Sequence, residues 1–480
     1  PRARTLNGTY EGLHSEEWDQ DFFLGVPFAK PPVAGRRFRI AQAIDEAWED
    51  VREAKEYSAE CIGYGGDNNG YPLSEDCLYL NIIRPSSPFT NTTADDNSPR
   101  LPVAIWIHGG GFYQGGGVDA RYNLTYLVSE SVTLGMPIIG ITINYRLGGW
   151  GFLASDEIMT SGQTNLGLRD QRAAMRWVQE NIEAFGGDPA QVTIFGESAG
   201  AASIGLHLTA HGGRDDGLFS AAAMQSGNPI YYRPFNSTAD WWNFLYAQVV
   251  RDTGCAIHPS EAPASGTALE CLRHVPFEQL HGVFNSSEVL RTTWGPVIDG
   301  DLIAKRTSQQ VSAGEFVKVP ILAGTNTDEG SVFAPIPMET EEDFVRFLKT
   351  NTRVLPALDD AAVEKVLELY PLPDTSNSNS NTTSSSATAN ALSPTLPFSP
   401  SPHPYGLHWP RAVAYATDVL FAAPRRATCA AWSAAAAPAY CYRFAAPAPR
   451  TAWRDPALVG VAHFADVRFV LADVVGTGYN

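Results

Sequence analysis

Gln191-Val192-Thr193-Ile194-Phe195-Gly196-Glu197-Ser198-Ala199-Gly200 joins an apolar run to a Gly-x-Ser-x-Gly motif. The apolar run predicts a buried strand, and the mostly small residues from Ala199 to Leu208 predict a helix that packs against it. A serine hydroxyl becomes a useful nucleophile when a sharp strand-to-helix turn presents it to a base, and the flanking glycines permit that turn. The motif is short, and a glycine-rich turn with a spectator serine has the same pattern. Other motifs must decide between the two readings.

A second glycine motif lies upstream, at the end of another apolar run. Leu101 to Ile107 predicts a buried strand, and His108-Gly109-Gly110-Gly111-Phe112 follows it. Consecutive glycines leave backbone N–H groups uncovered, and such donors stabilise the oxyanion that forms during acyl transfer. Loss of one such donor typically slows the reaction by about a hundred- to a thousandfold. Together the two motifs indicate a hydrolase in which the N–H of Ala199 completes the oxyanion hole.

With both motifs present, the chain resembles the type-B carboxylesterase/lipase family, which includes cholinesterases, carboxylesterases and fungal Candida rugosa-type lipases. The matching segments follow the family's order: Phe22–Pro32, Ser74–Asn81, Asn144–Gly148, Asn165–Gln171 and Gly196–Gly200. The resemblance implies an α/β-hydrolase fold, with a large, mostly parallel central sheet flanked by helices. It also implies a single domain with loop insertions over residues 1–480.

The resemblance also assigns the site residues. It implies Ser198 as the nucleophile, Glu329 as the acid and His463 as the base, and this chain order is that of α/β-hydrolases. Gly110, Gly111 and Ala199 carry over as the oxyanion donors.

Two further side chains are expected to support these groups. Glu197 adds a carboxylate beside the nucleophile, where it helps to hold the imidazolium or a water, and Ser226 resembles a family serine that supports the acid–base pair. Three other histidines are rivals that we assign to structural roles: His108 to the glycine loop, and His207 and His211 to the helix after the nucleophile.

Composition agrees with an α/β enzyme. Alternating apolar strands and amphipathic helices run along the chain without an internal repeat. The clearest helix is predicted over residues 168–185, where Leu168, Met175 and Val178 recur at helical spacing before Gly186-Gly187.

The net charge of −18 gives no general attraction for nucleic acid or an anionic membrane. No apolar run reaches the roughly 18 residues that a membrane helix needs. The expected partner is a small-molecule ester, with no metal and no organic cofactor, and the default oligomeric state is a monomer.

The six cysteines and six glycosylation sequons favour a secreted glycoprotein. The resemblance implies disulfides between Cys61 and Cys77 and between Cys255 and Cys271, and it leaves open whether Cys429 and Cys441 pair. The sequons begin at Asn7, Asn91, Asn123, Asn236, Asn285 and Asn381.

Two segments depart from the family pattern. Residues 371–404 are rich in Ser, Asn, Thr and Pro and predict a disordered surface insertion, because such a tract buries too little apolar surface to order itself. The chain ends at Asn480, soon after His463, where relatives usually carry further helices, so we expect an incomplete C-terminus.

The segment between Cys61 and Cys77 bears on the substrate. Its 15 residues, Ile62 to Asp76, are rich in glycine and asparagine and offer little apolar surface to a lipid interface. We therefore expect a short or absent lid, and hydrolysis of soluble short- to medium-chain esters through an acyl-enzyme. A lipase or sterol esterase acting on long-chain esters is the alternative enzyme, and a catalytically silent adhesion module of the same fold is the alternative from another class.

The walls of the substrate pocket are less well marked in the sequence. Trp294 lies where the family has acyl-pocket residues, Leu290 is a further candidate, and an ordinary core role for Trp294 is equally compatible with the sequence. Tyr71 is a weak substitute for the tryptophan with which choline esterases bind a quaternary ammonium.

Overall fold

The structure is a computed structural model that describes residues 1–86, 100–230, 239–256, 267–350, 355–372, 403–447, 456–473 and 475–476. Nearly all of the predicted insertion at 371–404 lies outside the described residues, as do the sequons at Asn91, Asn236 and Asn381.

A large mixed sheet forms the centre of the described chain, with strand order β14-β13-β12-β11-β9-β10-β8-β4-β3. The five pairings from β14 to β10 are parallel, and the three from β10 to β3 are antiparallel. The mostly parallel sheet predicted from the sequence is thus confirmed. The strands are β3 (Leu13–Ser15), β4 (Gln20–Pro27), β8 (Tyr79–Pro85), β9 (Leu101–Ile107), β10 (Ile139–Ile143), β11 (Gly187–Glu197), β12 (Ala221–Gln225), β13 (Ile321–Asn326) and β14 (Ala439–Phe444).

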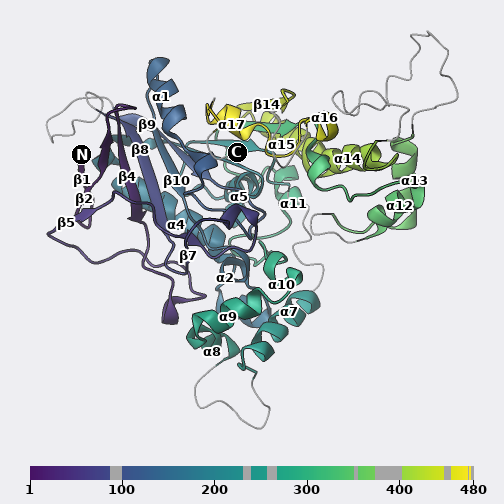
Figure 1. Ribbon diagram of the computed structural model, residues 1–480, viewed down its shortest axis with the longest axis horizontal. Helices are drawn as coiled ribbons and strands as arrows, with labels where there is room; N and C mark the ends of the chain where they lie inside the picture. The colour runs from purple at the N-terminus through teal and green to yellow at the C-terminus, as the bar shows by residue number, and fades with distance from the viewer. Residues whose placement is uncertain are drawn as a thin grey trace.

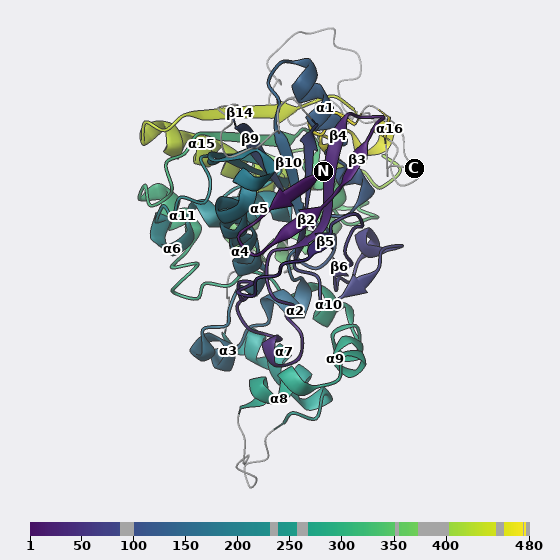
Figure 2. The ribbon, with the colours of Figure 1, turned by 90° about the vertical axis from the view of Figure 1, so that its left-hand side faces the viewer.

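Helices cover both faces of the sheet, which explains why its central strands are apolar on both sides. On one face, Ile105 and Ile194 lie in the main core cluster with residues of α4 (Leu166–Asn181) and α5 (Ala199–Leu208). On the other face, Trp106 and Phe195 pack with residues of α1 (Thr125–Thr133) and α17 (Val467–Val470). Figure 2 shows α4 and α5 to the left of the strands β3 and β4.

The two helices that the sequence predicts most clearly are present. The helix after Ser198 is α5, which begins at Ala199 and ends at Leu208 as predicted. The helix predicted over 168–185 begins at Leu166, and its last turn, Ile182–Phe185, is a 3₁₀ turn. Tighter turns of this kind are common at helix ends, and the sequence periodicity does not separate them from α-helix.

Two groups of helices extend from the sheet (Figure 1). One consists of α7 (Ala239–Asp252), α8 (Ala268–His274), α9 (Phe277–Phe284) and α10 (Glu288–Thr292). The other consists of α12 (Glu341–Lys349), α13 (Asp360–Leu369) and α14 (Trp409–Thr417), with its own apolar cluster around Phe344 and Trp409. A π-helical turn, η7 (Asp418–Ala422), connects α14 to α15 (Ala423–Ala434).

The remaining elements are short. They are β1 (Arg2–Arg4), β2 (Thr9–Glu11), β5 (Val51–Glu53), β6 (Glu60–Cys61), β7 (Leu73–Ser74), α2 (Gly148–Phe152), α3 (Asp156–Ser161), α6 (Ala210–Gly213), α11 (Thr307–Ser312) and α16 (Pro456–Val459). None of the helices in the described ranges is both long and apolar enough to cross a membrane.

Disulfides close three short loops of the described chain. Cys61 pairs with Cys77, and Cys255 pairs with Cys271. The pairing that the sequence left open is also present, because Cys429 of α15 is bonded to Cys441 of β14. This third bond ties α15 to the edge strand of the sheet.

Candidate active site

Ser198 sits in a strained turn between β11 and α5. Its φ is 55° and its ψ −120°, a conformation that costs a residue with a Cβ about 1–3 kcal/mol. The Ser198 N–H donates to the carbonyl of Gln225 at 2.9 Å. A Cβ added at Gly196 or Gly200 would lie 2.4 or 1.9 Å from the carbonyl oxygen of Ile107, so only glycine lets the turn approach β9 this closely. The surrounding structure therefore holds the serine in place.

The glycine loop after β9 lies directly against this turn. A Cβ added at Gly109 would be 3.1 Å from the Cβ of Ser198 and 2.9 Å from Oε2 of Glu197. The glycine loop and the nucleophile therefore lie next to each other, as the two motifs predict.

The expected oxyanion donors belong to this loop and to the start of α5. Gly110 and Gly111 have φ values of 90° and 60°, which a glycine adopts without steric cost. Ala199 is the first residue of α5, and the first N–H groups of a helix have no acceptor within the helix. These backbone groups can serve an oxyanion, and that role remains a prediction.

Glu329 and His463, which are 134 residues apart in the chain, meet in a buried contact. His463 Nδ1 lies 2.6 Å from Glu329 Oε2. The other carboxylate oxygen of Glu329 accepts hydrogen bonds from the Ser226 hydroxyl at 2.5 Å and from the Asn326 N–H at 2.6 Å. The expected acid, base and supporting serine are therefore together.

Sheet topology explains why these residues meet. Strands β11, β12 and β13 are parallel neighbours, so their carboxyl ends lie at one edge of the sheet. Ser198 follows β11, Ser226 follows β12, and Glu329 begins the short turn η5 (Glu329–Val332) soon after β13.

Glu197 is a buried carboxyl on the other side of the imidazole. Its Oε1 lies 3.2 Å from His463 Nε2, and the residue is 1% exposed. Burial raises the pKa of Glu197 to about 8; His463 opposes this rise, and the charges of Asp466 and Glu329 add to it. This raised pKa favours the neutral form of Glu197 at pH 7, whereas the sequence suggested a carboxylate.

Asp466 is a further buried carboxyl that the sequence analysis missed. The Asn326 side-chain amide donates to it at 3.1 Å and the Tyr442 hydroxyl at 3.3 Å. Burial, and next the charge of Glu329, raise the pKa of Asp466 to about 6. Its position three residues after His463 was the only available signal, because its partners come from other strands.

Two aromatic rings contact the histidine. The ring centroids of Phe333 and Phe421 lie 5.3 and 5.1 Å from that of His463. Phe421 belongs to the π-helical turn η7, an irregularity that the residue pattern does not predict.

The other histidines have structural surroundings. His108 is buried, stacks on Tyr145 at 4.3 Å, and has its pKa lowered by burial to about 4. His207 is buried, with Nε2 2.7 Å from Oε1 of Gln171, and His211 lies near a surface aspartate. These contacts agree with the structural roles expected for His108 and His207. The placement of His211 on the helix after the nucleophile is wrong, because α5 ends at Leu208 and His211 lies in α6, where its φ of 50° is not helical.

The expected pocket walls are not supported. Trp294 stacks on Trp242 at 5.6 Å, and neither Trp294 nor Leu290 has exposed surface, so neither lines an open pocket. Both residues belong to the main core cluster, which is the alternative that the sequence left open for Trp294. The Tyr71 hydroxyl accepts a hydrogen bond from the Ala120 N–H at 2.9 Å and so connects two loops.

Three sequons lie in the described chain. The side-chain amide of Asn7 donates to two backbone carbonyls, and Asn123 Oδ1 accepts from the N–H of Thr125. Asn285 is exposed and is the most accessible of the three.

A strained serine after a central parallel strand, a glycine loop beside it, and a downstream acid–histidine pair are features of an α/β-hydrolase. The solved neighbours agree with this fold. The carboxylesterase family model matches residues 3–480; the chain therefore belongs to this family and is a carboxylic ester hydrolase.

The chain is similar to secreted and fungal enzymes. Lipase 1 of Geotrichum candidum is 35% identical over 408 residues, which are 76% of this chain and 69% of the relative. Secreted lipase 1 of Botryotinia fuckeliana is 38% identical over 343 residues, 65% of this chain and 56% of the relative. The crystal structure of Aspergillus niger EstA matches with a TM-score of 0.76 and 29% identity, covering 98% of this chain and 81% of that one.

Proposed function

We propose that the protein hydrolyses soluble short- to medium-chain esters through an acyl-enzyme on Ser198. The observation that carries the chemistry is the 2.6 Å contact of His463 Nδ1 with Glu329 Oε2, at the sheet edge where Ser198 also lies. This contact fixes which nitrogen of the imidazole faces the acid.

The mechanism follows from that orientation. His463 Nε2 accepts the Ser198 proton as the hydroxyl attacks the ester carbonyl, and the N–H groups of Gly110, Gly111 and Ala199 hold the oxyanion. The imidazolium then protonates the leaving alcohol, and water repeats the sequence on the acyl-enzyme. Glu329 keeps the imidazole in the required tautomer and stabilises the imidazolium.

The loop between Cys61 and Cys77 supports this substrate class. Hydrogen bonds and an ion pair fasten it to the glycine-loop segment, residues 108–121. Asn68 is buried; its amide donates to Glu60 at 2.7 Å and to the Gly115 carbonyl at 3.3 Å, and its oxygen accepts the Gly115 N–H at 3.2 Å. Other bonds between the two segments are Tyr64 N–H to the Tyr113 carbonyl (2.8 Å), Ala120 N–H to Tyr71 (2.9 Å) and Arg121 to Asp67 (2.7 Å). Opening this loop would break all of these bonds.

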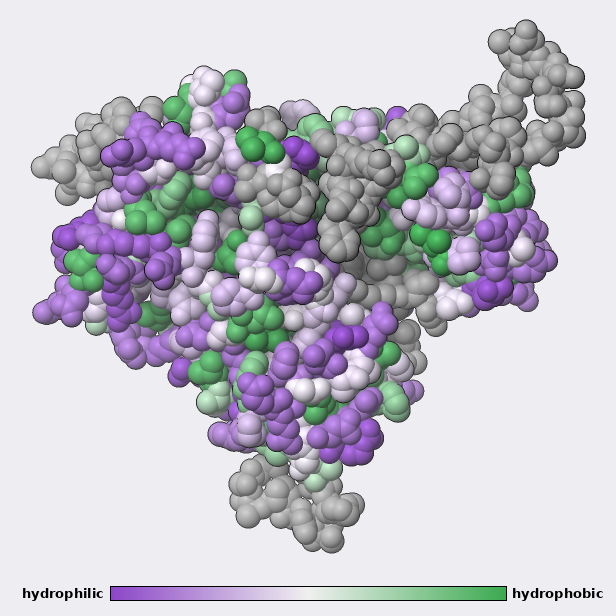
Figure 3. Space-filling view, in the orientation of Figure 1, coloured by the Kyte–Doolittle hydropathy of each residue, from purple (hydrophilic) through white to green (hydrophobic). Residues whose placement is uncertain are grey.

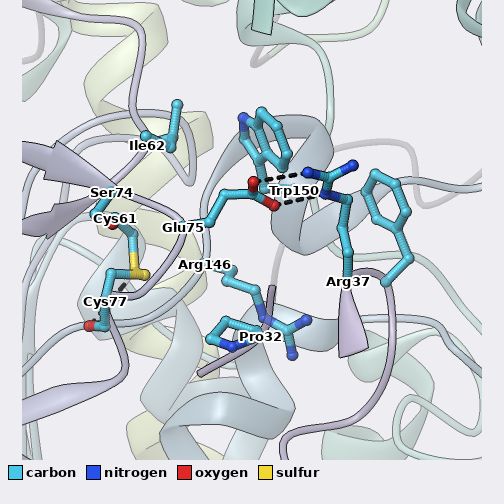
Figure 4. A pocket seen from close by; sticks show the side chains of 10 residues that line it. Pro32, Arg37, Cys61, Ile62, Ser74, Glu75, Cys77, Arg146 and Trp150 are labelled. Carbon is cyan, nitrogen blue, oxygen red and sulfur yellow. Dashed lines mark hydrogen bonds and ion pairs between the residues drawn. A yellow bond between two sulfur atoms is a disulfide. The ribbon is translucent and has the colours of Figure 1, made fainter. Parts of the chain in front are cut away.

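The base of the loop is also fastened (Figure 4). The Arg37 guanidinium donates two hydrogen bonds to the Glu75 carboxylate, at 2.6 and 2.7 Å, beside Trp150 and the Cys61–Cys77 disulfide. Two-point ion pairs of this kind are geometrically specific, and this pair is almost buried. A polar loop held at its base and its tip is a poor lid, which supports activity without an interface.

Hydrolysis rates on both sides of a substrate's solubility limit test this proposal. We expect a smooth saturation curve with a short-chain triglyceride, no jump at the limit, and kcat/KM falling for long acyl chains in a p-nitrophenyl ester series. A rate jump at the limit, together with a preference for long chains, would instead identify a lipase.

We also propose that the protein acts outside the cell. Three disulfides and the similarity to a secreted lipase support this location, because disulfides persist in oxidising compartments.

A further inference from the structure

Two buried carboxyl groups contact the imidazole of the proposed site, and a third lies three residues after it. Glu197, Glu329 and Asp466 are each 1% exposed or less, and His463 must be neutral before the reaction. Charges this far from water are costly unless an opposite charge or hydrogen bonds compensate them. Glu329 has the hydrogen bonds of a carboxylate, but the charge of Asp466 opposes its own when that group is ionised.

A cation is held at the end of the strand that leads to Glu329. Arg425 of α15 reaches the carboxyl ends of β13 and β14, where its Nη1 donates to the Thr325 hydroxyl at 2.9 Å and to the Tyr442 carbonyl. Thr325 directly precedes Asn326, whose N–H donates to Glu329 at 2.6 Å. The cation and the acid are thus attached to the same end of β13.

The electrostatic environment of Arg425 agrees with this placement. Burial lowers the pKa of Arg425, and the charges of Arg426 and Arg443 lower it further, whereas Glu329 and Tyr442 raise it. Arg426 and Arg443 are both exposed, whereas Arg425 is partly buried. Solvent screens exposed charges more strongly than partly buried ones, so the charge of Arg425 is less screened than the charges of Arg426 and Arg443.

Resting on the proposed function, we propose that Arg425 is a positioning residue whose charge stabilises the Glu329 carboxylate and thereby the Glu329–His463 pair. A nearby cation disfavours protonation of both members of the pair. Without it, the imidazole takes up its inactivating proton at a higher pH. Loss of the Arg425 charge must therefore move the acid limb of the pH–rate profile toward neutral pH.

The test compares Arg425→Gln with Arg426→Gln, which removes the same charge from the exposed neighbouring position, and with Arg425→Lys, which keeps the charge. We expect R425Q to move the acid limb of kcat/KM upward by about half a pH unit or more, so that it loses about threefold at pH 6 and less at pH 8. The acid limb of R426Q should stay within about 0.2 pH unit of that of the unmodified protein, because solvent screens the Arg426 charge. The acid limb of R425K should stay within the same range, because lysine retains the charge.

A purely structural role for Arg425 predicts a different pattern. R425Q would then lower the rate equally at every pH, or R425K would move the limb as far as R425Q, and either result overturns the proposal. Should R425Q fail to fold, Arg425→Met removes the same charge with a different uncharged side chain. R425M must then move the limb in the same direction, and an unmoved limb contradicts the proposal.

The Ser198→Ala variant separates this inference from the proposed function. If S198A still hydrolyses the ester, the proposed function is contradicted. If S198A is inactive but R425Q leaves the pH–rate profile unmoved, only the role of Arg425 is contradicted.

Discussion

Glu329 is the residue around which the site is organised. One of its oxygens holds the imidazole, and the other accepts from the Ser226 hydroxyl and the Asn326 N–H. All of these bonds are short and buried, and all end on the same carboxylate. Loss of the carboxylate therefore affects all of them, whereas loss of the supporting serine removes one hydrogen bond.

Replacing Glu329 by Gln should lower kcat by about a thousand- to ten-thousandfold, because an amide no longer holds the imidazole tautomer that accepts the serine proton. Ser226→Ala removes one hydrogen bond to a charged group and should cost about ten- to a hundredfold. Steady-state kinetics with one soluble ester compares the two. Equal losses in both variants would contradict the separate roles.

Glu197 should behave as a neutral acid at pH 7, since its pKa of about 8 lies above that pH. Glu197→Gln mimics the neutral form, so its kcat/KM should lie within about threefold of the unmodified value at pH 7. Above pH 8 the native carboxyl ionises and stabilises the imidazolium, so the unmodified protein should become relatively faster than E197Q as the pH rises to 9. A hundredfold loss at pH 7 would show that the ionised form is required.

Sequence motifs predicted the nucleophile, acid and base, but not the side chains that surround them. Ser198, Glu329 and His463 follow from motifs, because each lies in a short characteristic segment. Asp466, Phe421 and Arg425 follow from none, because they reach the site through contacts between separate elements. Trp294 was a candidate wall and is core, since an aromatic residue in an apolar segment fits both roles.

At the scale of elements, the loop between Cys61 and Cys77 is the segment on which the proposed substrate class depends. Its sequence predicted little apolar surface and a short lid, but not the bonds that fasten it to the glycine-loop segment. Those bonds join residues about 50 positions apart, and local sequence patterns carry no information on such pairs. By contrast, the strand–turn–helix around Ser198 was predictable, because local periodicity and glycines specify it.

Asn68→Ala should loosen this loop. The change leaves the buried Glu60 carboxyl without its amide partner and should reduce the free energy of unfolding by about 1–3 kcal/mol. Since Asn68 also holds Gly115, kcat should fall as well. Thermal unfolding and kinetics check both effects against Asn69→Ala, the exposed neighbour of the same type, which should change neither. Equal behaviour of the two variants would contradict the fastening.

At the scale of the whole molecule, the protein combines a net charge of −18 with several buried carboxyl groups. Hydrophilic residues dominate the face in Figure 3, where apolar residues form small separate groups. Inside, burial raises the pKa values of Glu60, Glu197 and Asp466 to about 7, 8 and 6. Carboxyl groups with raised pKa values are neutral in the fold at a pH where they ionise in the unfolded chain, so they oppose folding as the pH rises.

Glu60 gives a direct test of this pH dependence. Its destabilising contribution is absent below about pH 4.5, grows as the pH rises toward 7, and then stays constant at about 3 kcal/mol. Glu60→Gln removes the titration, so its stability relative to the unmodified protein should increase by about that amount between pH 4.5 and 8. Denaturant unfolding measures the difference, with the exposed Glu49→Gln as control. A difference that stays constant with pH would contradict the burial of an ionising Glu60.

The central claim is that Ser198 is the activated nucleophile of an ester hydrolase. Mass spectrometry after labelling of the folded protein with a fluorophosphonate ester tests it most directly, because such probes react with serines that a base activates. We predict one covalent adduct, on the peptide that contains Ser198, and no adduct in folded S198A. An unlabelled native protein, or equal labelling of S198A, would contradict the claim.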